Sequence, residues 1–424
     1  MVALTIVLLL VLLFIGMPIG FVLLVVGSIG LYLTAGFDSL QGILATTAYR
    51  GVNNYTYSAI PLFILMAHLL SKSKIADDLF ESVLKWMGHL PGGAGVATVI
   101  GSAGFGALSG SSTAATSVMS QIAIPQMVKA KSSPAFAAGL VATTTGTLAA
   151  LIPPSIPLIL YGIQTETSVG QLFIAGILPG ILLTVLLVIT VVIVGIKQKS
   201  ISEKFSWNER LKSLKSIWPA VLLILIVISV VYFGVATPTE AAAFGVIGAL
   251  VIGLSLKRLK YKQIVDSLFS TVKSTAMIFV IIVGANVFAY YITLTRVGFK
   301  IISSIEASGF SPWMIFFLIV IMYLILGMFM DMFGSMLLTL PLVYPLMVSL
   351  GFDTIWFGII LVLLLEIGLV TPPVGINLYI TSDNSGVPVK DVLKGSLPFI
   401  GVLLLTILIL VFFPQIALFL PSKM

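Results

Sequence analysis

Cysteine is absent from this sequence of 424 residues, and only two histidines occur. The chain can therefore form no disulfide, carry out no thiolate chemistry and bind no metal through cysteine. Neither a His-Glu-x-x-His zinc protease motif nor a Gly-x-x-x-x-Gly-Lys-Ser/Thr loop for ATP phosphates is present. These absences argue against a zinc protease and against ATP hydrolysis by a phosphate-binding loop of this type.

Charge is also scarce, because charged residues make up 9% of the chain and hydrophobic residues 59%. A soluble domain usually carries about 25% charged residues. A helix needs about 20 apolar residues to cross a bilayer, and such runs occur at 171–196, 217–235, 278–295, 313–330 and 396–420. We therefore expect an all-α polytopic membrane protein without a soluble domain.

The basic residues gather in two segments separated by two apolar spans. They are Lys197, Lys199, Lys204, Arg210, Lys212 and Lys215 in the first, and Lys257, Arg258, Lys260, Lys262 and Lys273 in the second. Both segments lie on the same side of the membrane, which the positive-inside rule assigns to the cytoplasm. We interpret them as topology signals and expect no nucleic-acid partner.

Prolines recur at a nearly constant interval. Pro125 and Pro345 are 220 residues apart, and the pairs Pro153/Pro372 and Pro179/Pro398 are each 219 apart. This register predicts two repeats, 55–196 and 278–424, which in transporters are commonly inverted. A scaffold segment, 1–54, would precede them, and cytoplasmic loops with a connecting scaffold hairpin, 197–277, would join them.

Each repeat opens with a less apolar stretch, at 71–90 and at 296–311. The first alternates apolar and charged residues as an amphipathic helix at the membrane interface does. Such helices could be arms that brace a moving domain or plain connectors, and the sequence favours neither.

Two segments place helix breakers and polar residues inside apolar stretches. The first is Ser109-Gly110-Ser111-Ser112-Thr113, followed by Pro153-Pro154-Ser155; the second is Gly327 to Asp331, followed by Thr371-Pro372-Pro373-Val374-Gly375. Irregular backbone is tolerated at membrane depth only where protein buries it or where it lines a wet cavity. Paired broken helices in equivalent halves indicate a transporter's binding site.

The first segment, within a hairpin at 101–127, offers hydroxyls and freed carbonyls suited to Na⁺. Helix N-termini at the same point would attract a carboxylate. Close packing of membrane helices through small residues is the alternative explanation. A serine protease using Ser109 or Ser111 with His68 is disfavoured, because a protease has no use for a second matching hairpin.

Carboxylates inside membrane segments are functional by default. Asp331 is interpreted as a cation ligand or charge balance, with an N-cap at the membrane edge as the alternative. Glu366 is expected to pair with a polar group in the core, and Asn377 to face substrate. Asp383-Asn384 is expected in a loop, and Glu240 in the first turn of a helix capped by Thr237.

These motifs together resemble a known family. They are Gly106-Ala107-Leu108-Ser109-Gly110-Ser111-Ser112-Thr113-Ala114, Phe136-Ala137-Ala138-Gly139, Leu151-Ile152-Pro153-Pro154-Ser155, Pro238-Thr239-Glu240-Ala241, Gly327-Met328 with Asp331, and Thr371-Pro372-Pro373-Val374-Gly375. The chain resembles the large membrane (M, DctM-like) subunit of tripartite ATP-independent periplasmic (TRAP) transporters over essentially its whole length.

The resemblance implies an inverted-repeat, elevator-type secondary transporter of the bacterial inner membrane. Two re-entrant hairpins, at 101–127 and 327–347, would face broken helices near 145–155 and 366–377. The implied Na⁺ ligands are Ser109, Gly110, Ser111 and Ser112 with Gly146 in one half, and Gly327, Asp331, Thr371 and Gly375 in the other. The implied substrate-binding residues are Ser112, Thr113, Pro154, Ser155 and Asn377.

The resemblance also implies partners. A periplasmic substrate-binding protein would deliver an organic acid of the sialic acid or C4-dicarboxylate type. A small four-span membrane subunit would be a separate chain, because the first repeat begins near residue 55. A stand-alone Na⁺- or H⁺-coupled anion transporter without a binding protein remains the alternative.

Overall fold

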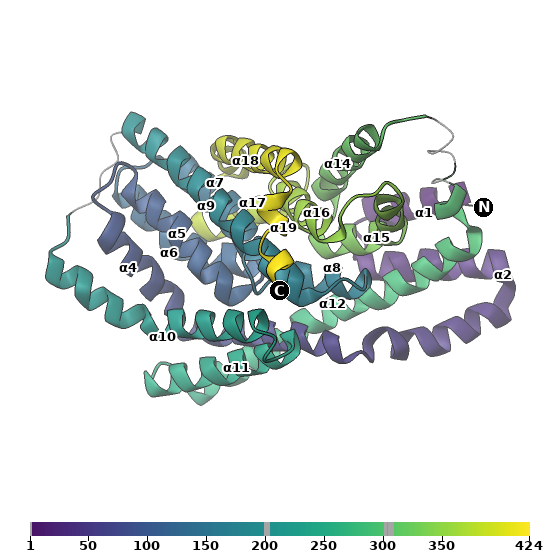
Figure 1. The fold of residues 1–424 in the computed structure, drawn as a ribbon, viewed down its shortest axis with the longest axis horizontal. Helices are drawn as coiled ribbons and strands as arrows, with labels where there is room; N and C mark the ends of the chain where they lie inside the picture. The colour runs from purple at the N-terminus through teal and green to yellow at the C-terminus, as the bar shows by residue number, and fades with distance from the viewer. Residues whose placement is uncertain (1, 199–203, 301–302, 304–308) are drawn as a thin grey trace.

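The computed structural model describes residues 2–198, 204–300, 303 and 309–424, and the described residues are almost entirely helical (Figure 1). Nine described helices are long and apolar enough to cross a membrane. The expectation of an all-α polytopic protein is therefore confirmed.

Two series of five helices share one register. The first is α5 (Gly93–Ser109), α6 (Ser112–Lys129), α7 (Pro134–Leu151), α8 (Ile156–Gln164) and α9 (Val169–Gln198). The second is α14 (Pro312–Phe329), α15 (Met332–Ser349), α16 (Thr354–Gly368), α17 (Ile376–Ser385) and α18 (Val389–Phe412). From α6 onward each helix starts 220 residues before its counterpart: 112 and 332, 134 and 354, 156 and 376, 169 and 389. This register supports two repeats, with their matching helices at 93–198 and 312–412, a narrower extent than the expected 55–196 and 278–424.

The helix pairs at the two hairpins are longer than the sequence suggested. The first begins at Gly93, after a left-handed Gly92, rather than at residue 101. In the second, the apolar run at 313–330, which we had interpreted as a separate span, is the first helix of the pair. Apolar composition alone does not distinguish a full span from half of a hairpin.

The centre of the molecule is formed by α7 and α16, which pack against each other. α7 is buried from Phe136 to Leu151 and α16 from Trp356 to Gly368. Burial in protein rather than lipid suits the polar residues that these helices carry, which are Thr143, Thr144, Thr145, Thr147 and Glu366. Both helices start with a side-chain cap, from Ser133 and from Asp353.

A second group of helices lies along the lower edge of Figure 1. It contains α2 (Ile19–Val52), α10 (Trp207–Tyr232), α11 (Pro238–Ser255) and α12 (Tyr261–Thr295). α2 is kinked at Gly36, where φ is 81°, and packs closely on α12. A Cβ added to Gly27 would lie 2.8 Å from the backbone N of Phe288, so only glycine permits this approach.

Shorter elements complete the chain. They are α1 (Val2–Phe14), η1 (Tyr55–Ser58), α3 (Ala59–Lys72), α4 (Ile75–Met87), α19 (Gln415–Leu418) and η2 (Pro421–Lys423). The amphipathic stretch at 71–90 corresponds to α4, which is bent by 63° from the preceding helix. Asp78 of α4 forms an ion pair with Arg258, at the end where the basic residues gather. The expected counterpart at 296–311 falls partly outside the described residues.

Two local expectations have different outcomes. Thr237 and Glu240 form a reciprocal capping box at the start of α11, as their spacing indicated. The expectation that Asp383 and Asn384 lie in a loop is wrong, because α17 continues to Ser385 and ends only at the left-handed Gly386. Asn384 donates a hydrogen bond to Ser117 Oγ at 3.3 Å, which joins α17 to α6.

Candidate functional site

The first hairpin tip rests on the break between α7 and α8. Gly110 is left-handed (φ 60°) between α5 and α6, and its carbonyl accepts a 3.1 Å hydrogen bond from Ile156 N. A Cβ on Gly110 would lie 2.5 Å from the Pro154 carbonyl oxygen. Ser155 caps α8, accepting from Leu158 N at 3.3 Å and donating to the Ala150 carbonyl. Pro154 therefore contacts the hairpin tip directly, and Ser155 fixes the start of the helix on which the tip rests.

The second tip rests on the break between α16 and α17 in the same manner. The Met328 carbonyl accepts a 3.0 Å hydrogen bond from Val374 N. This bond has the same role as the one between Gly110 and Ile156, since each joins a hairpin tip to a helix break, although it lies 218 rather than 220 positions later. A Cβ on Gly327 would lie 2.7 Å from Gly368 Cα, so hairpin and broken helix touch through glycine.

The remaining proposed residues of the second half surround this break. Gly375 adopts a left-handed conformation (φ 51°) at the start of α17, and Thr371 Oγ1 donates to the Ile367 carbonyl at 2.6 Å. Asp331 caps α15, where its Oδ2 accepts from Phe333 N at 3.0 Å and Gly334 N at 3.2 Å. Asp331 is therefore an N-cap, which was the alternative to a cation ligand. Its second carboxylate oxygen, Oδ1, takes part in neither of these two bonds.

A buried polar cluster joins the first tip to the second broken helix. Ser112 Oγ donates to Glu366 Oε2 at 3.0 Å and accepts from Asn377 Nδ2 at 3.0 Å. Glu366 and Asn377 are both 0% exposed. Gly146 borders the cluster, since a Cβ there would lie 2.4 Å from Ser112 Oγ and 3.1 Å from Glu366 Oε2. Four elements from both repeats therefore meet at one point.

Two oxygen atoms in this cluster lack hydrogen-bond donors. Glu366 Oε1 and Asn377 Oδ1 are buried and have no partner among the described residues. An unsatisfied buried polar atom costs about 1–3 kcal/mol, and more when the group is charged. The cluster is therefore complete only when something donates to, or coordinates, these two oxygens.

Glu366 is a member of the site that neither the hairpin motifs nor the family resemblance indicated. Its signal was a carboxylate inside an otherwise apolar helix, which is expensive at membrane depth. Its partner could not be found from spacing, because Ser112 lies 254 positions away in the other repeat. The expected pairing with a polar group in the core is confirmed by this hydrogen bond.

A cavity of about 260 Å³ lies between the hairpin tips and the helices α3 and α12. Its lining includes Ser111 and Thr113 from the first tip, Phe333 from the second, His68 from α3 and Ser274 from α12. Thr113 is exposed to this cavity, whereas Ser109 is buried beneath the tip. A serine protease would require a hydrogen bond between His68 and Ser109 or Ser111. The hydrogen bonds of the described residues include no such bond.

Comparison with known proteins gives a consistent result. Residues 6–416 match the family model described as "Tripartite ATP-independent periplasmic transporter, DctM component". The C4-dicarboxylate TRAP transporter large permease protein DctM of Pseudomonas aeruginosa is 37% identical, over 91% of this chain and 90% of that protein. The sialic acid protein SiaM of Vibrio cholerae is 32% identical (97% and 96%), and the ectoine protein TeaC of Halomonas elongata is 33% identical (96% and 96%).

A solved structure shares the fold. The YdaH transporter of Alcanivorax borkumensis superposes with a TM-score of 0.67 over 95% of this chain and 96% of that one, at 13% identity. The resemblance seen in the sequence motifs is confirmed by the family match. The chain belongs to the DctM family of tripartite ATP-independent periplasmic transporters, and it is a multi-pass permease subunit of the bacterial inner membrane rather than an enzyme.

Proposed function

We propose that this permease subunit imports an organic acid of the sialic acid or C4-dicarboxylate type, coupled to Na⁺, by an elevator mechanism. A periplasmic binding protein delivers the substrate, and a separate four-span membrane subunit enlarges the scaffold. Relatives named for C4-dicarboxylates, sialic acid and ectoine agree with a small polar organic substrate.

The observation that carries the Na⁺ proposal is the polar cluster around Ser112. Glu366 Oε1 and Asn377 Oδ1 are buried acceptors without donors, beside a hairpin tip of broken backbone. Transporters hold Na⁺ with such unwound carbonyls and oxygen side chains, so these residues fit the ion. Na⁺ bound there would neutralise the buried carboxylate.

We infer two ion sites, one in each half, from the family resemblance. In the first the ligands come from Ser109, Gly110, Ser111, Ser112 and Gly146, now joined by Glu366 and the side-chain oxygen of Asn377. In the second they come from Gly327, Asp331, Thr371 and Gly375, with Asp331 as the charged member.

The cavity between the tips and α12 is the proposed substrate site. The first turn of α6, which has no side-chain cap, reaches it at Ser111. A free helix N-terminus favours a carboxylate, whereas the N-terminus of α15 is already capped by Asp331. Thr113 faces the cavity directly, while Ser112 and Asn377 lie in the cluster behind the tip and Pro154 and Ser155 beneath it. Ser112, Asn377, Pro154 and Ser155 would therefore influence substrate binding indirectly, by holding the hairpin tip in place.

The cavity also suggests which parts move. One wall belongs to α6, α8 and α15 of the two five-helix series, and the other to α3 and α12. In an elevator the repeated helices would carry the cavity past the scaffold formed by α2, α3, α10, α11 and α12. Substrate and ion would then cross the membrane with the tips closed on them.

Reconstitution in liposomes with the four-span subunit tests this function. Uptake of labelled sialic acid or succinate is measured with and without binding protein, and with an inward Na⁺ gradient or an equal K⁺ gradient. We expect uptake only when both Na⁺ and binding protein are present. Uptake with Na⁺ but without binding protein would support a stand-alone transporter. Equal uptake under the Na⁺ gradient and the K⁺ gradient would contradict Na⁺ coupling.

A pair of variants localises the effect. Ser111→Ala combined with Ser112→Ala should lower Na⁺-driven uptake, because it removes hydroxyls from the first tip. Ser255→Ala, on the exposed end of α11, is the matched control and should transport normally. Unchanged uptake in the double variant would assign the tip's role to backbone carbonyls alone.

A further inference from the structure

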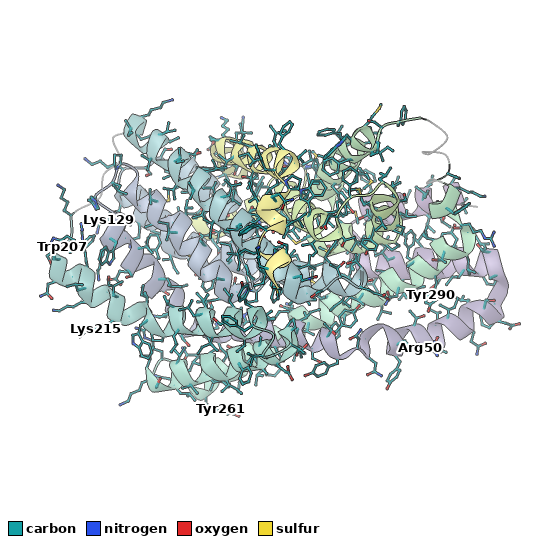
Figure 2. All side chains as sticks on the ribbon, viewed as in Figure 1. Arg50, Lys129, Trp207, Lys215, Tyr261 and Tyr290 are labelled. Atoms are coloured by element: carbon teal, nitrogen blue, oxygen red, sulfur yellow. The ribbon has the colours of Figure 1, made fainter. Side chains whose placement is uncertain are left out.

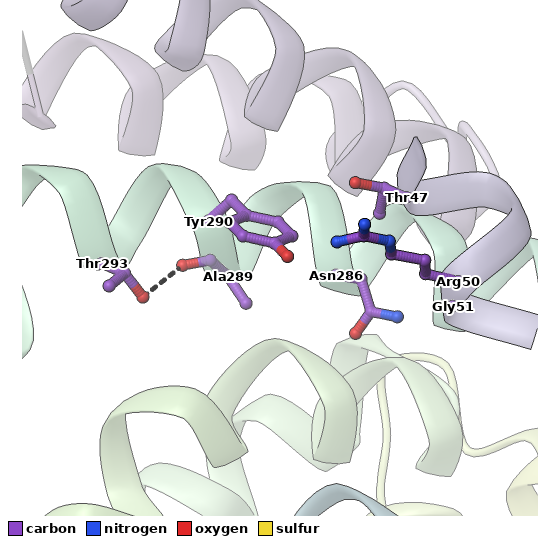
Figure 3. Close-up of a pocket in the computed structure, with 7 residues that line it drawn as sticks. All are labelled: Thr47, Arg50, Gly51, Asn286, Ala289, Tyr290 and Thr293. Carbon is purple, nitrogen blue, oxygen red and sulfur yellow. Dashed lines mark hydrogen bonds between the residues drawn. The ribbon is translucent and has the colours of Figure 1, made fainter. Parts of the chain in front are cut away.

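A second cavity, of about 370 Å³, lies between the end of α2, which carries Arg50, and α12, which carries Tyr290 (Figure 2 and Figure 3). Its polar lining is formed by Thr47, Arg50, Asn286, Tyr290 and Thr293. It shares no lining residue with the cavity at the hairpin tips. The proposed transport function assigns it no role.

The polar side chains of this cavity can all donate hydrogen bonds, and its lining includes no acidic residue. Figure 3 shows the Arg50 guanidinium lying between the side chains of Thr47, Tyr290 and Asn286. A guanidinium carries five donors in a fixed fork and no acceptor. The cavity therefore suits a ligand that is negatively charged and rich in acceptor oxygens.

Two of these donors lack partners within the protein. Thr47 Oγ1 is buried, in a residue 4% exposed, and has no hydrogen bond in the described part of the chain. The ion pairs and side-chain hydrogen bonds found among residues 2–198, 204–300, 303 and 309–424 do not include Arg50. Arg50 is exposed, so its guanidinium is accessible to a ligand, whereas Thr47 Oγ1 is buried beneath the cavity wall. An oxyanion bound in the cavity would therefore pair with Arg50.

The surroundings indicate where that oxyanion comes from. The rim and its neighbours expose large apolar side chains, with Tyr49 68%, Tyr290 47% and Leu294 48% exposed. α12 starts at the basic, cytoplasmic end, and the cavity lies within its last three turns before Thr295. Exposed tyrosines are typical of the membrane–water interface, and long basic side chains reach the headgroups there.

We propose that this cavity binds the phosphate of a phospholipid headgroup in the outer leaflet, with Arg50 as the charged anchor. Asn286 and Tyr290 supply further donors, and the lipid chains cover the exposed side chains of α2 and α12. Arginine pairs with phosphate through two parallel hydrogen bonds, which lysine or glutamine does not reproduce. The site would hold the part of α2 that follows the kink at Gly36 against α12.

Thermal unfolding of the delipidated chain tests the proposal. Phosphatidylglycerol is titrated back in detergent, and diacylglycerol with the same chains serves as a probe without phosphate. We expect phosphatidylglycerol to stabilise the wild type and diacylglycerol not to. Arg50→Gln should need about tenfold more phosphatidylglycerol for half-maximal stabilisation, and Tyr290→Phe should show a smaller shift in the same direction.

Lys300→Gln is the matched control, because it removes a positive charge at the same end of α12 from outside the cavity. It should titrate like the wild type. Equal stabilisation of wild type and Arg50→Gln by phosphatidylglycerol would overturn the proposal, and so would equal stabilisation by diacylglycerol. Arg50-dependent stabilisation by inorganic phosphate or succinate, but not by lipid, would assign the site to a soluble anion instead.

Discussion

The two central helices, α7 and α16, occupy equivalent places in the repeat but differ at one decisive position. Residue 146 is glycine, and its counterpart 220 positions later is Glu366. The two residues lie against each other at the centre, where Glu366 Oε2 would be 3.1 Å from a Cβ on Gly146. Only one of the two equivalent positions carries a carboxylate, that of Glu366. Gly146, at the other position, has no side chain and so leaves space for this carboxylate.

The hairpin tips differ in a complementary way. Ser111 and Asp331 are also 220 positions apart and stand at the starts of α6 and α15. The second tip carries its own carboxylate, whereas the first is neutral and meets Glu366 from the other repeat through Ser112. Each tip therefore has one carboxylate beside it, supplied by the second repeat in both cases.

Gly146→Ala should break this arrangement most severely. Its Cβ would lie 2.4 Å from Ser112 Oγ and 2.6 Å from Asn377 Nδ2, so the cluster would have to open. We expect loss of Na⁺-driven uptake and a destabilisation of about 1–3 kcal/mol from overpacking, measured by liposome uptake and thermal unfolding. Gly401→Ala is the control, because a Cβ there has no neighbour within 4 Å. Normal uptake by Gly146→Ala would refute the role of the cluster.

Asp331→Asn separates charge from capping at the second tip. Asparagine caps helices as well as aspartate does, so the protein should fold while its apparent Na⁺ affinity falls about tenfold through loss of a charged ligand. Asp353→Asn is a matched control, since Asp353 caps α16 by accepting from Ile355 N and Trp356 N. A wild-type Na⁺ dependence of uptake in Asp331→Asn would restrict Asp331 to capping.

Ser155→Ala is expected to have the smallest effect. Ser155 caps α8, and the equivalent start of α17 has Gly375 without a side-chain cap. Loss of the cap should cost about 1 kcal/mol of stability with little change in apparent Na⁺ affinity, as measured by thermal unfolding and by uptake at varied Na⁺. A large fall in substrate affinity without loss of stability would instead place Ser155 in direct contact with substrate.

The sequence allowed the fold class and the repeat to be predicted, because apolar runs and prolines such as Pro153 and Pro372 are local signals. The hairpin tips and helix breaks were also visible as glycine, proline and hydroxyl residues. The Ser112–Glu366 contact was not predictable, since it joins residues 254 positions apart in different repeats. The role of Gly146 as the space for Glu366 emerges only when α7 and α16 are packed together.

Binding of Na⁺ to Glu366→Gln, compared with wild type and Glu240→Gln, tests the proposed cluster most directly. Glu240 lies in the exposed capping box of α11 and controls for loss of a carboxylate. Thermal unfolding is followed as Na⁺ replaces K⁺ at constant ionic strength. We predict stabilisation of wild type and Glu240→Gln by Na⁺, and little or none of Glu366→Gln despite normal folding. Equal Na⁺ stabilisation of all three proteins would contradict a Na⁺ site at Glu366.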